Sequence, residues 1–455
     1  MMKTQTKFHL KALLAIGVSA AVLTGCAQKE LILDGLREDL RSPDYDVNDP
    51  AAVAAATAAA EKAGAVENLS RPVSLGRAQN IGAWTHRGYN AKHNLPHAAF
   101  TAAPSVIWRA KIGDGNTGRE RIVAAPVSDG SRIFTVDSKG LLSATATSGA
   151  KVWSVNIRAA GERAGTGSGL ALAGGKLFAT TSNGSLVALD PASGKILWRQ
   201  QVTGGISAAP TASGGKVYIT SAASGAYAIN AANGRIDWHL PGLPTQYGFA
   251  GAAAPAISGG DVVFAMANGS MVGVDARKGT PDWVARLPGD RAGRGKNVLQ
   301  AFGGEPVVAG GLIFAATQAG RAFAVTPSGS VRWKADEGAA GMMAVAGGAV
   351  FFVNDENKLV RLSARDGKRL WIVDLPRYDT DNTRKQKSVY PAFGPLMAGG
   401  QLWVASGDGF LRSYNPADGA VTREVELPSG AAARPIIVGG TLYLVTTKGD
   451  LLALR

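Results

Sequence analysis

The sequence is poor in the residue types from which most active sites are built. Among 455 residues there are one cysteine and five histidines, so an internal disulfide and a Cys-x-x-Cys motif are excluded. The chain also contains no Gly-x-Ser-x-Gly nucleophile elbow and no phosphate-binding loop. These absences predict a protein that is not an enzyme and that binds no cofactor and no metal ion.

Long apolar runs are also missing. The run at residues 12–23 is too short to span a bilayer as a stable helix. Three lysines precede this run. Its last residue begins the sequence Leu-Thr-Gly-Cys, in which small residues precede Cys26, the only cysteine. This arrangement resembles a bacterial lipoprotein signal. We therefore expect residues 1–25 to be removed and Cys26 to be lipidated; an ordinary signal peptide with an accidental cysteine is the alternative.

The residue after Cys26 is alanine rather than aspartate. By resemblance to the sorting rule of such lipoproteins, this implies a lipid anchor in the outer membrane, on its periplasmic face. Removal of residues 1–25 deletes three lysines and no acids, which changes the net charge from +14 to +11. The remaining basic residues are dispersed and form no cluster interleaved with aromatics, so nucleic acid is not an expected partner.

Residues 26–80 predict a lipidated tether that is partly of low complexity. Within it, residues 30–41 mix leucines with charges and fit either a short helix or an added strand, and residues 49–64 are alanine-rich. We expect the folded domain at residues 81–455. It begins with a distinct lead-in segment at residues 84–97.

Two histidines of the lead-in segment, His93 and His97, have the spacing of metal ligands on one helical turn. Pro96 lies between them and disfavours that helix, and no glutamate follows His93. We therefore expect both histidines to pack the lead-in segment rather than to bind metal.

The chain contains a repeated unit, marked by tryptophans at separations of 45, 45, 40, 45, 50 and 38 residues: Trp108, Trp153, Trp198, Trp238, Trp283, Trp333 and Trp371. Each complete unit carries a Gly pair or Asp-Gly turn, a second hairpin turn and an Asx-type turn that closes on glycine. Gly pairs such as 174–175 tolerate the positive φ angles of tight hairpins. Each unit therefore predicts a four-stranded antiparallel meander, and a period of 40 to 45 residues is typical of a β-propeller.

The ends of the chain predict how the ring closes. The Gly-turn landmark occurs eight times if Asp129-Gly130 is the first, but the last unit stops at Arg455 after its third strand. Residues 105–111, which contain Trp108, form an isolated fourth-strand pattern before the first complete unit. We expect this strand to complete the last blade and to remove the exposed edges. The prediction is an all-β, eight-bladed propeller with about 44 residues per blade.

The repeat resembles a known propeller family. The pattern Pro-x-x-x-Gly-Gly-x-x-Tyr/Phe followed by Leu-x-Ala-Leu-Asp-x-x-x-Gly-x-x-x-Trp is similar to the pyrroloquinoline-quinone-type repeat, and residues 209–238 and 254–283 carry it well. A PQQ-dependent dehydrogenase is therefore one alternative. Such enzymes have longer chains, clustered calcium ligands and a vicinal disulfide, which one cysteine rules out. We expect the tryptophan and the Gly turn to lock neighbouring blades together.

A lipoprotein signal joined to eight such blades, with the lead-in segment before them, resembles the BamB family of outer-membrane β-barrel assembly factors. The resemblance implies a non-enzymatic scaffold that docks on the periplasmic domains of a BamA-type barrel-assembly subunit, beside other assembly lipoproteins. Its role would be to aid insertion of outer-membrane proteins. The partner-facing residues would lie on the connections 239–254 and 284–305. An extracytoplasmic binding or sensor propeller is the other alternative.

Four connections between blades are long, at residues 154–168, 239–254, 284–305 and 372–393. In four-stranded blades these connections leave the ring on one face, and long loops in compact repeats are usually functional. Their aromatic and arginine residues, typical of interface anchors, are Tyr247, Phe249, Arg286, Arg291, Arg294, Phe302, Arg377, Tyr378 and Tyr390. We predict that the first two are apolar anchors and that Arg286, Arg291 and Arg294 set orientation. Variable loops without a partner are the alternative.

Overall fold

The structure is a computed structural model. The chain forms two compact units, Met1–Gly64 and Ala65–Arg455. The structure describes residues 49, 51, 68–162, 168–203, 205–206, 208–221, 225–242, 253–289, 300–380, 382, 386 and 388–455. Cys26 lies outside the described residues, so its lipidation stays a prediction. The description below concerns the second unit.

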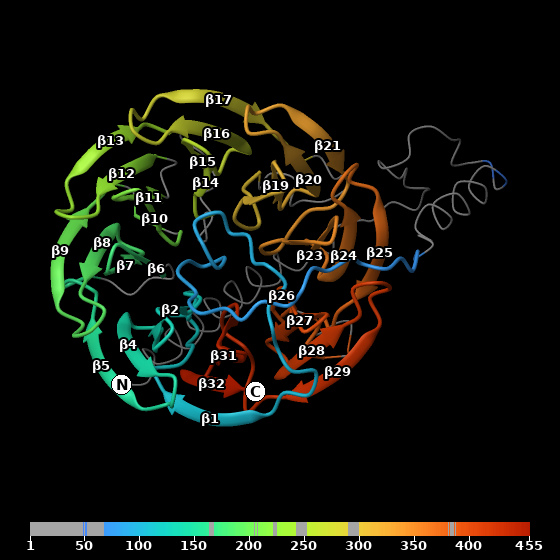
Figure 1. Cartoon of the computed structure of the whole chain (residues 1–455), viewed down its shortest axis with the longest axis horizontal. Coiled ribbons are helices and arrows are strands. Elements are labelled where there is room, and N and C mark those ends of the chain that lie inside the picture. Colours follow the sequence, from blue (N-terminus) through green and yellow to red (C-terminus); the bar gives the residue numbers. More distant parts are fainter. Residues whose placement is uncertain are drawn as a thin grey trace, which may run out of the picture. The chain divides into compact units, whose positions relative to one another are not determined.

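Thirty-two strands in the described residues form eight four-stranded antiparallel sheets, arranged as blades around a ring (Figure 1). Blade 1 contains β2 (Val127–Ser128), β3 (Arg132–Val136), β4 (Leu141–Ala146) and β5 (Lys151–Asn156). Blade 2 contains β6 (Ser168–Ala173), β7 (Lys176–Thr181), β8 (Ser185–Leu189) and β9 (Ile196–Gln201). Blade 3 contains β10 (Thr211–Ser213), β11 (Lys216–Thr220), β12 (Ala226–Asn230) and β13 (Ile236–Leu240).

The next four blades repeat this order of an inner strand followed by three strands further out. Blade 4 contains β14 (Ala256–Ser258), β15 (Asp261–Ala265), β16 (Ser270–Asp275) and β17 (Pro281–Arg286). Blade 5 contains β18 (Val307–Ala309), β19 (Leu312–Thr317), β20 (Arg321–Val325) and β21 (Val331–Ala335). Blade 6 contains β22 (Ala344–Ala346), β23 (Ala349–Val353), β24 (Lys358–Ser363) and β25 (Arg369–Asp374). Blade 7 contains β26 (Ala392–Ala398), β27 (Gln401–Ser406), β28 (Phe410–Tyr414) and β29 (Val421–Glu426).

Blade 8 joins the two ends of the propeller sequence. Its sheet order is β1 (Val106–Lys111), β32 (Asp450–Leu454), β31 (Thr441–Val445) and β30 (Ile436–Val438). The backbones of Ser105 and Arg455 exchange two hydrogen bonds of 3.0 Å, and Arg109 forms a 2.8 Å ion pair with Asp450. The predicted closure by a strand within 105–111 is confirmed. No helix occurs in the described part of residues 68–455, which confirms an all-β, eight-bladed propeller.

No described helix is long and apolar enough to cross a membrane.

Tryptophans of the outer strands hold neighbouring blades together. In six of the seven repeats the indole Nε1 donates a hydrogen bond of 2.9–3.2 Å to a backbone carbonyl in the next blade, at Thr147, Pro191, Ala231, Ala276, Ala364 and Pro416. The acceptors lie in the turns between third and fourth strands. Glycine ends each turn because a Cβ there would meet the indole: at Gly279 it would lie 2.5 Å from Trp238. The predicted locking of blades is confirmed.

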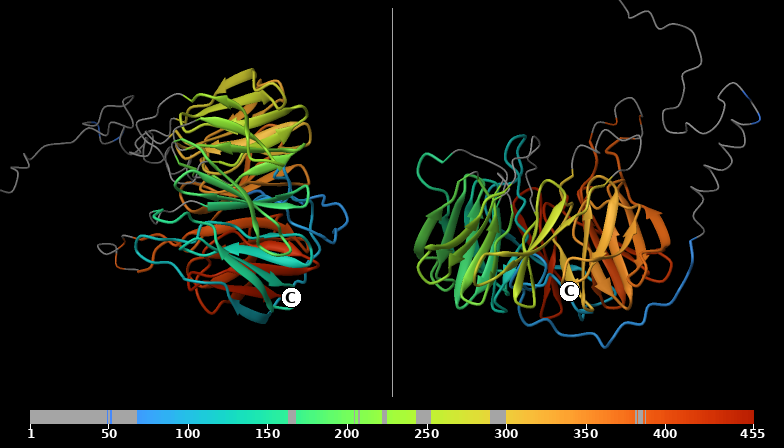
Figure 2. Two further views of the ribbon diagram at one scale, coloured as in Figure 1. Left: turned by 90° about the vertical axis from the view of Figure 1, so that its left-hand side faces the viewer. Right: turned by 90° about the horizontal axis from the view of Figure 1, so that it is seen from above.

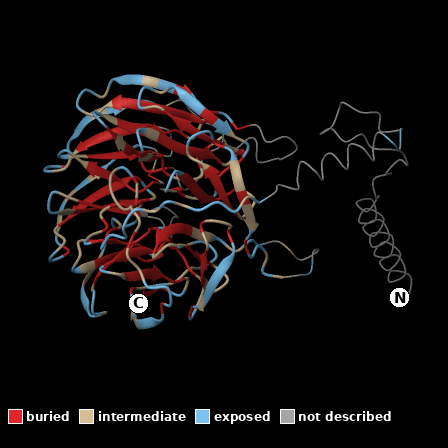
Figure 3. Cartoon of the chain, turned by 45° about the vertical axis from the view of Figure 1, so that its right-hand side comes forward, coloured by how far each residue is buried: buried red, intermediate tan, exposed pale blue. Residues whose placement is uncertain are grey.

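Burial differs between the strands of a blade because each sheet is packed between two others. The second and third strands are covered on both faces, so β31 is buried at every position, whereas the outer strand β1 is exposed or half-buried throughout. Figure 3 shows this division, with red strands inside and pale blue strands at the rim. Between blades 1 and 2, for example, Phe134 of β3 packs in one cluster with Leu177 of β7 and Val187 of β8.

A stretch before β1, residues 68–104, crosses one face of the ring and is called the N-terminal strap here. It forms backbone hydrogen bonds with the first strands of blades or the turns that follow them, through Ser128, Leu172, Ile257, Val308, Met397, Gly399 and Gly439. His86 of the strap contacts Ala212 of blade 3, and Val73 packs against blade 6. The strap therefore contacts all eight blades. In the right-hand view of Figure 2 it runs below the ring in blue.

The ring has two different faces. The strap face carries the strap, the Gly-pair turns between first and second strands, and the turns between third and fourth strands. Gly174 and Gly175 of one Gly pair have φ angles of 54° and 69°, as tight hairpins require. The opposite face, called the loop face, carries the connections between blades and the turns between second and third strands. The coloured parts of these connections protrude above the ring in the right-hand view of Figure 2.

Candidate docking face and central cavity

The loop face carries five long connections rather than the four predicted. They span residues 112–126, 157–167, 241–255, 287–306 and 375–391, between the outer strand of one blade and the inner strand of the next. The connection 112–126, which follows β1, was missed. It is as long as 241–255. The sequence feature that could have revealed this connection is the long stretch between Trp108 and the first Gly turn at Asp129-Gly130.

Most of the predicted partner-binding residues lie outside the described residues: Tyr247, Phe249, Arg291 and Arg294. Arg286 is described. It is the last residue of β17 and is exposed at the loop face. Phe302 is 2% exposed and packs in the cluster between blades 4 and 5, so its place among the surface candidates is wrong. Its apolar neighbours in this cluster, such as Ile313, explain why the aromatic side chain of Phe302 is buried rather than exposed.

The other candidates lie on connection 375–391. The Arg377 guanidinium lies 5.1 Å from the ring centre of Tyr378, a cation–π contact. Arg377 is exposed, whereas Tyr378 and Tyr390 are half-buried. The backbone N–H of Tyr390 donates to the Arg377 carbonyl at 2.8 Å, which joins the two arms of the connection.

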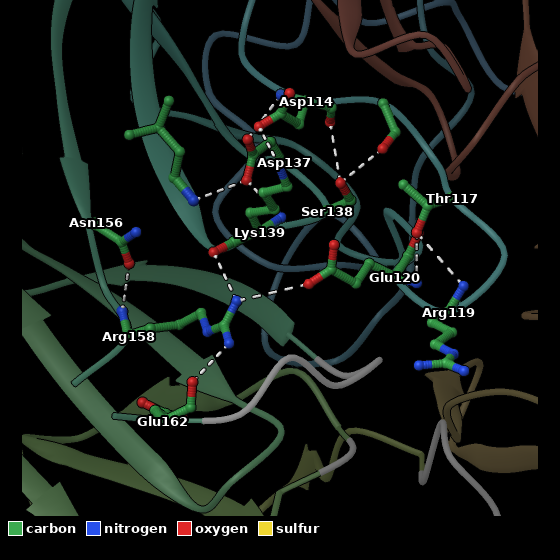
Figure 4. A network of polar contacts seen from close by, with 12 residues as sticks. Asp114, Thr117, Arg119, Glu120, Asp137, Ser138, Lys139, Asn156, Arg158 and Glu162 are labelled. Carbon is green, nitrogen blue, oxygen red and sulfur yellow. Dashed lines mark hydrogen bonds and ion pairs between the residues drawn. The ribbon is translucent and has the colours of Figure 1, made fainter. Parts of the chain in front are cut away.

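The connection 112–126 is fixed to the hairpin of blade 1 by a buried carboxylate (Figure 4). Asp137 is 5% exposed, and its carboxylate accepts hydrogen bonds from the N–H groups of Asp114 at 2.7 Å and of Lys139 and Leu141 at 2.8 Å. The Ser138 hydroxyl donates to the Gly115 carbonyl at 2.6 Å. These bonds hold the start of the connection in one conformation.

Arg158 extends this network to the connection 157–167. Its guanidinium donates to the carbonyls of Lys139 at 3.2 Å and Glu162 at 2.6 Å, and it lies 3.9 Å from the Glu120 carboxylate. One arginine therefore links two connections and a hairpin (Figure 4). This part of the loop face is built as a rigid surface, which reduces the entropy lost on binding.

Exposed basic groups also lie on the loop face: Arg119 and Arg121 on the connection 112–126 that the network holds, and Arg286 at the end of β17 in blade 4. Arg119, Arg121 and Arg286 are exposed, and none of their side chains has a hydrogen-bond or ion-pair partner among the described residues. Figure 4 shows the Arg119 side chain directed away from the network. Sequence reasoning missed Arg119 and Arg121, although the alternation Arg-Glu-Arg-Ile-Val at 119–123 carries the signal. Ile122 is buried at 2% exposure and orients the alternating residues outward.

Apolar side chains are exposed between these charges. Val123 is 36% exposed and Val389 is 47% exposed, and both line the mouth of a cavity in the central channel. The cavity has a volume of about 360 Å³. Its outer part is formed by Asn357, Arg377 and other residues of the loop face. Exposed arginines around an apolar centre are the composition expected of a docking surface.

The inner end of the cavity holds buried charges contributed by distant parts of the sequence. Arg87 of the strap forms a 2.9 Å ion pair with Glu305, which is 2% exposed. Burial alone would raise the pKa of Glu305, but Arg87 and its neighbours hold that pKa below its usual value. Burial lowers the pKa of Arg434 to about 10. Both groups are therefore ionised at neutral pH.

His93 and His97, two of the three histidines of the lead-in segment, have structural roles, as predicted. His93 is 2% exposed, and its Nδ1 lies 3.0 Å from the Pro306 carbonyl oxygen; burial lowers its pKa. His97 contacts the Gly76 carbonyl through Nδ1 at 2.8 Å and accepts from the Gly400 N–H through Nε2 at 2.9 Å. The described residues contain no group of three or more His, Cys, Asp or Glu side chains placed to hold a metal ion.

Comparison with known proteins identifies the family. A family model described as outer membrane protein assembly factor BamB matches residues 138–373 and 361–455. The chain belongs to the BamB family. It is 27% identical to the BamB of Salmonella typhimurium (strain LT2) over 379 residues, covering 79% of this chain and 91% of that protein. It is 26% identical to the BamB of Escherichia coli (strain K12), covering 78% and 90%.

Solved structures agree on the architecture. BamB from Moraxella catarrhalis superposes with a TM-score of 0.59 at 16% identity, covering 78% of this chain and 98% of that one. Quinohemoprotein alcohol dehydrogenase from Comamonas testosteroni gives 0.63 at 16% identity, covering 83% and 81%. At this identity both show the propeller fold alone. Because an assembly factor and an oxidoreductase share that fold, the fold does not select a function, whereas BamB family membership favours an assembly factor.

Proposed function

We propose that the protein is a non-enzymatic lipoprotein of the outer-membrane β-barrel assembly machinery. Its propeller docks through the loop face on the periplasmic domains of a BamA-type barrel-assembly subunit and aids insertion of outer-membrane proteins. Membership of the BamB family supports the assembly role. The observation that carries the choice of face is the strap, because it occupies the opposite face and contacts all eight blades.

The chemistry of the loop face suits such docking. Arg119, Arg121 and Arg286 supply positive charge that steers an acidic partner and fixes its orientation. Val123 and Val389 supply exposed apolar surface near the centre, where water is excluded on binding. The network around Asp137 and Arg158 orders this surface before the partner arrives.

A charge reversal tests the face. The double variant Arg119→Glu, Arg121→Glu should slow association with purified periplasmic domains of the barrel-assembly subunit by about tenfold or more at low salt, and by less at high salt. The matched control is Arg277→Glu, Lys278→Glu, which makes the same charge change at exposed positions of a turn on the strap face. The measurement is association kinetics with lipid-free protein. Slower binding in the control and normal binding in the first variant would place the partner on the strap face.

The predicted aromatic anchors are tested in the same assay. Tyr247→Ala combined with Phe249→Ala should weaken binding by about 2 kcal/mol or more if both side chains are central anchors. Separate variants of Arg291 and Arg294 should mainly change the association rate and its salt dependence. A double aromatic variant that binds like wild type would restrict the contact to the other connections.

The lipid anchor is tested at Cys26. Cys26→Ala should leave the precursor uncleaved by lipoprotein signal peptidase and abolish incorporation of labelled fatty acid. The wild-type protein should resist extraction from membranes by salt, because two or more acyl chains anchor firmly. Normal acyl labelling of the variant would exclude Cys26 as the lipidation site.

A further inference from the structure

One buried cation at the inner end of the central cavity lacks a full set of partners. Arg434 is 8% exposed, and its Nη2 donates to the Pro395 carbonyl at 3.1 Å. Its Nε and Nη1 have no hydrogen-bond partner among the described residues. The side chain lines the cavity. Unsatisfied donors of a buried guanidinium are rare in folded proteins and indicate a ligand or water at the site.

The charges around Arg434 leave an excess of one positive charge. Arg87 and Arg434 face the single carboxylate of Glu305, and Glu305 is already paired with Arg87 at 2.9 Å. His93 also faces this group and adds no charge, because burial lowers its pKa and keeps it neutral at pH 7. The acidic residues Asp355 and Glu356 lie with Arg377 on the outer part of the lining. The inner end is therefore the positive end of the cavity.

We propose that this cavity binds a small organic carboxylate, with the carboxylate group at Arg434 and an apolar body in the channel. Guanidinium donors match carboxylate oxygens in charge and geometry. The remaining lining includes Met342, Val353 and Phe393, which suit an apolar body and give no further anion contacts. The volume of about 360 Å³ lies at the lower end of the range for small-molecule sites.

Strap residues lie at the inner end of the cavity. Arg87 belongs to the strap, and a Cβ on its neighbour Gly88 would lie 2.7 Å from Met342, another lining residue. A ligand therefore enters from the loop face. Val123 and Val389 belong both to the mouth of the cavity and to the docking surface, whereas Arg434 lies at the inner end. Ligand binding at Arg434 is therefore measured with the protein alone, without the proposed partner.

The test uses hexanoate as the probe and hexanamide as its neutral isostere, with lipid-free protein in thermal-shift and calorimetric titrations. Hexanoate should raise the melting temperature, since a ligand that binds only the folded state stabilises it. Hexanamide should produce a much smaller shift, and acetate should bind more weakly than hexanoate because it lacks the apolar body. Equal effects of hexanoate and hexanamide, or no effect of either, would overturn the proposal without any variant being needed.

Variants then assign the site. Arg434→Met should reduce hexanoate affinity by about tenfold or more, as expected when a charged hydrogen-bond donor is lost. The matched control is Arg119→Met, an exposed arginine of the loop face outside the cavity, which should leave the affinity unchanged. Unchanged affinity in folded Arg434→Met would refute the assignment to Arg434. The docking variant Arg119→Glu, Arg121→Glu should also bind hexanoate normally, which separates failure of this proposal from failure of the docking proposal.

Discussion

The two faces of the ring are built from the same repeat, yet the chain uses them differently. On the strap face the turns are short and regular, and the strap crosses the ends of the inner strands. On the loop face the length of the connections varies, from the shortest at 336–343 to the longest at 287–306, and the connections carry exposed arginines. Packing constraints are therefore concentrated on the strap face. The other face is free to vary in length and chemistry, as in other repeat proteins.

The difference has a physical origin in the blade interfaces. Each tryptophan lock ends in a turn on the strap face, where glycine and indole are in direct contact. A longer turn there would separate the blades. The loop face lacks this repeated contact and instead uses particular networks, such as the Asp137 carboxylate with its three backbone donors. Changes that perturb each face separately test this difference.

The largest effect is expected from removing the strand that closes the ring. Deletion of residues 1–111 removes β1 and its pairing with β32, so blade 8 loses its outer strand and no cooperative melt is expected. Deletion of residues 1–104 removes the strap but keeps β1, and should lower the melting temperature to an intermediate value. Deletion of residues 1–67 should have little effect. Thermal melts of the three lipid-free proteins, if they coincided, would show that neither the strap nor β1 stabilises the ring.

A large but smaller effect is expected from the strap tryptophan. Trp84 is fully buried and packs edge-on against Tyr89 with ring centres 5.5 Å apart. Trp84→Ala should cost about 3–5 kcal/mol in urea unfolding, the range for large-to-small changes at buried aromatics. Tyr390→Ala, at a half-buried position of the loop face, should cost about 1 kcal/mol. Similar costs at the two positions would contradict the view that stability is concentrated on the strap face.

Much of the fold was predictable because it repeats. Tryptophan spacing and Gly turns predicted eight blades, and an unpaired strand pattern around Trp108 predicted closure with the last blade. The course of the strap was not predictable, since its contacts follow no period. His86 reaches Ala212 and Ala98 reaches Met397, and neither pairing leaves a mark in the local sequence.

The sequence allowed a face of the ring to be chosen as the candidate site, but it was a poorer guide to the individual residues exposed there. Loop length indicated the face, and Arg286 is exposed there as expected. Residue type alone could not separate the exposed Arg119 from the buried Phe302, because burial depends on what the neighbouring blade supplies. The charges of the cavity, Arg87, Glu305 and Arg434, come from three distant segments that only the closed ring brings together.

A third prediction concerns the pH dependence of the strap. Burial lowers the pKa of His86 from 6.5 to about 3 in the folded protein. Below pH 6.5 the unfolded chain takes up a proton that the folded chain does not, so stability is full above 6.5 and falls as the pH drops toward 3. The slope should reach about 1.4 kcal/mol per pH unit for this group. His93, whose pKa burial also lowers, adds to the loss in the same direction.

Urea unfolding of wild type and His86→Gln between pH 7 and pH 5 measures this slope while most carboxylates stay ionised. The variant is expected to be less stable at pH 7, because His86 contacts Ala212 through Nε2 at 3.1 Å. Its stability should nevertheless depend less on pH. Parallel curves for the two proteins would mean that His86 does not titrate differently on unfolding.

The smallest effect separates two roles of glycine on the strap face. Gly279 and Gly174 both have positive φ, of 75° and 54°, so Ala at either position adopts a left-handed conformation at a cost of about 1–2 kcal/mol. At Gly279 the new Cβ would also lie 2.5 Å from the Trp238 indole, whereas at Gly174 nothing lies within 4 Å. Gly279→Ala should therefore destabilise the propeller by about 1–3 kcal/mol more than Gly174→Ala, as overpacking does. If urea unfolding gave equal losses, the glycines would be required by the turn conformation alone, and the indole contact would not explain why the strap face is regular.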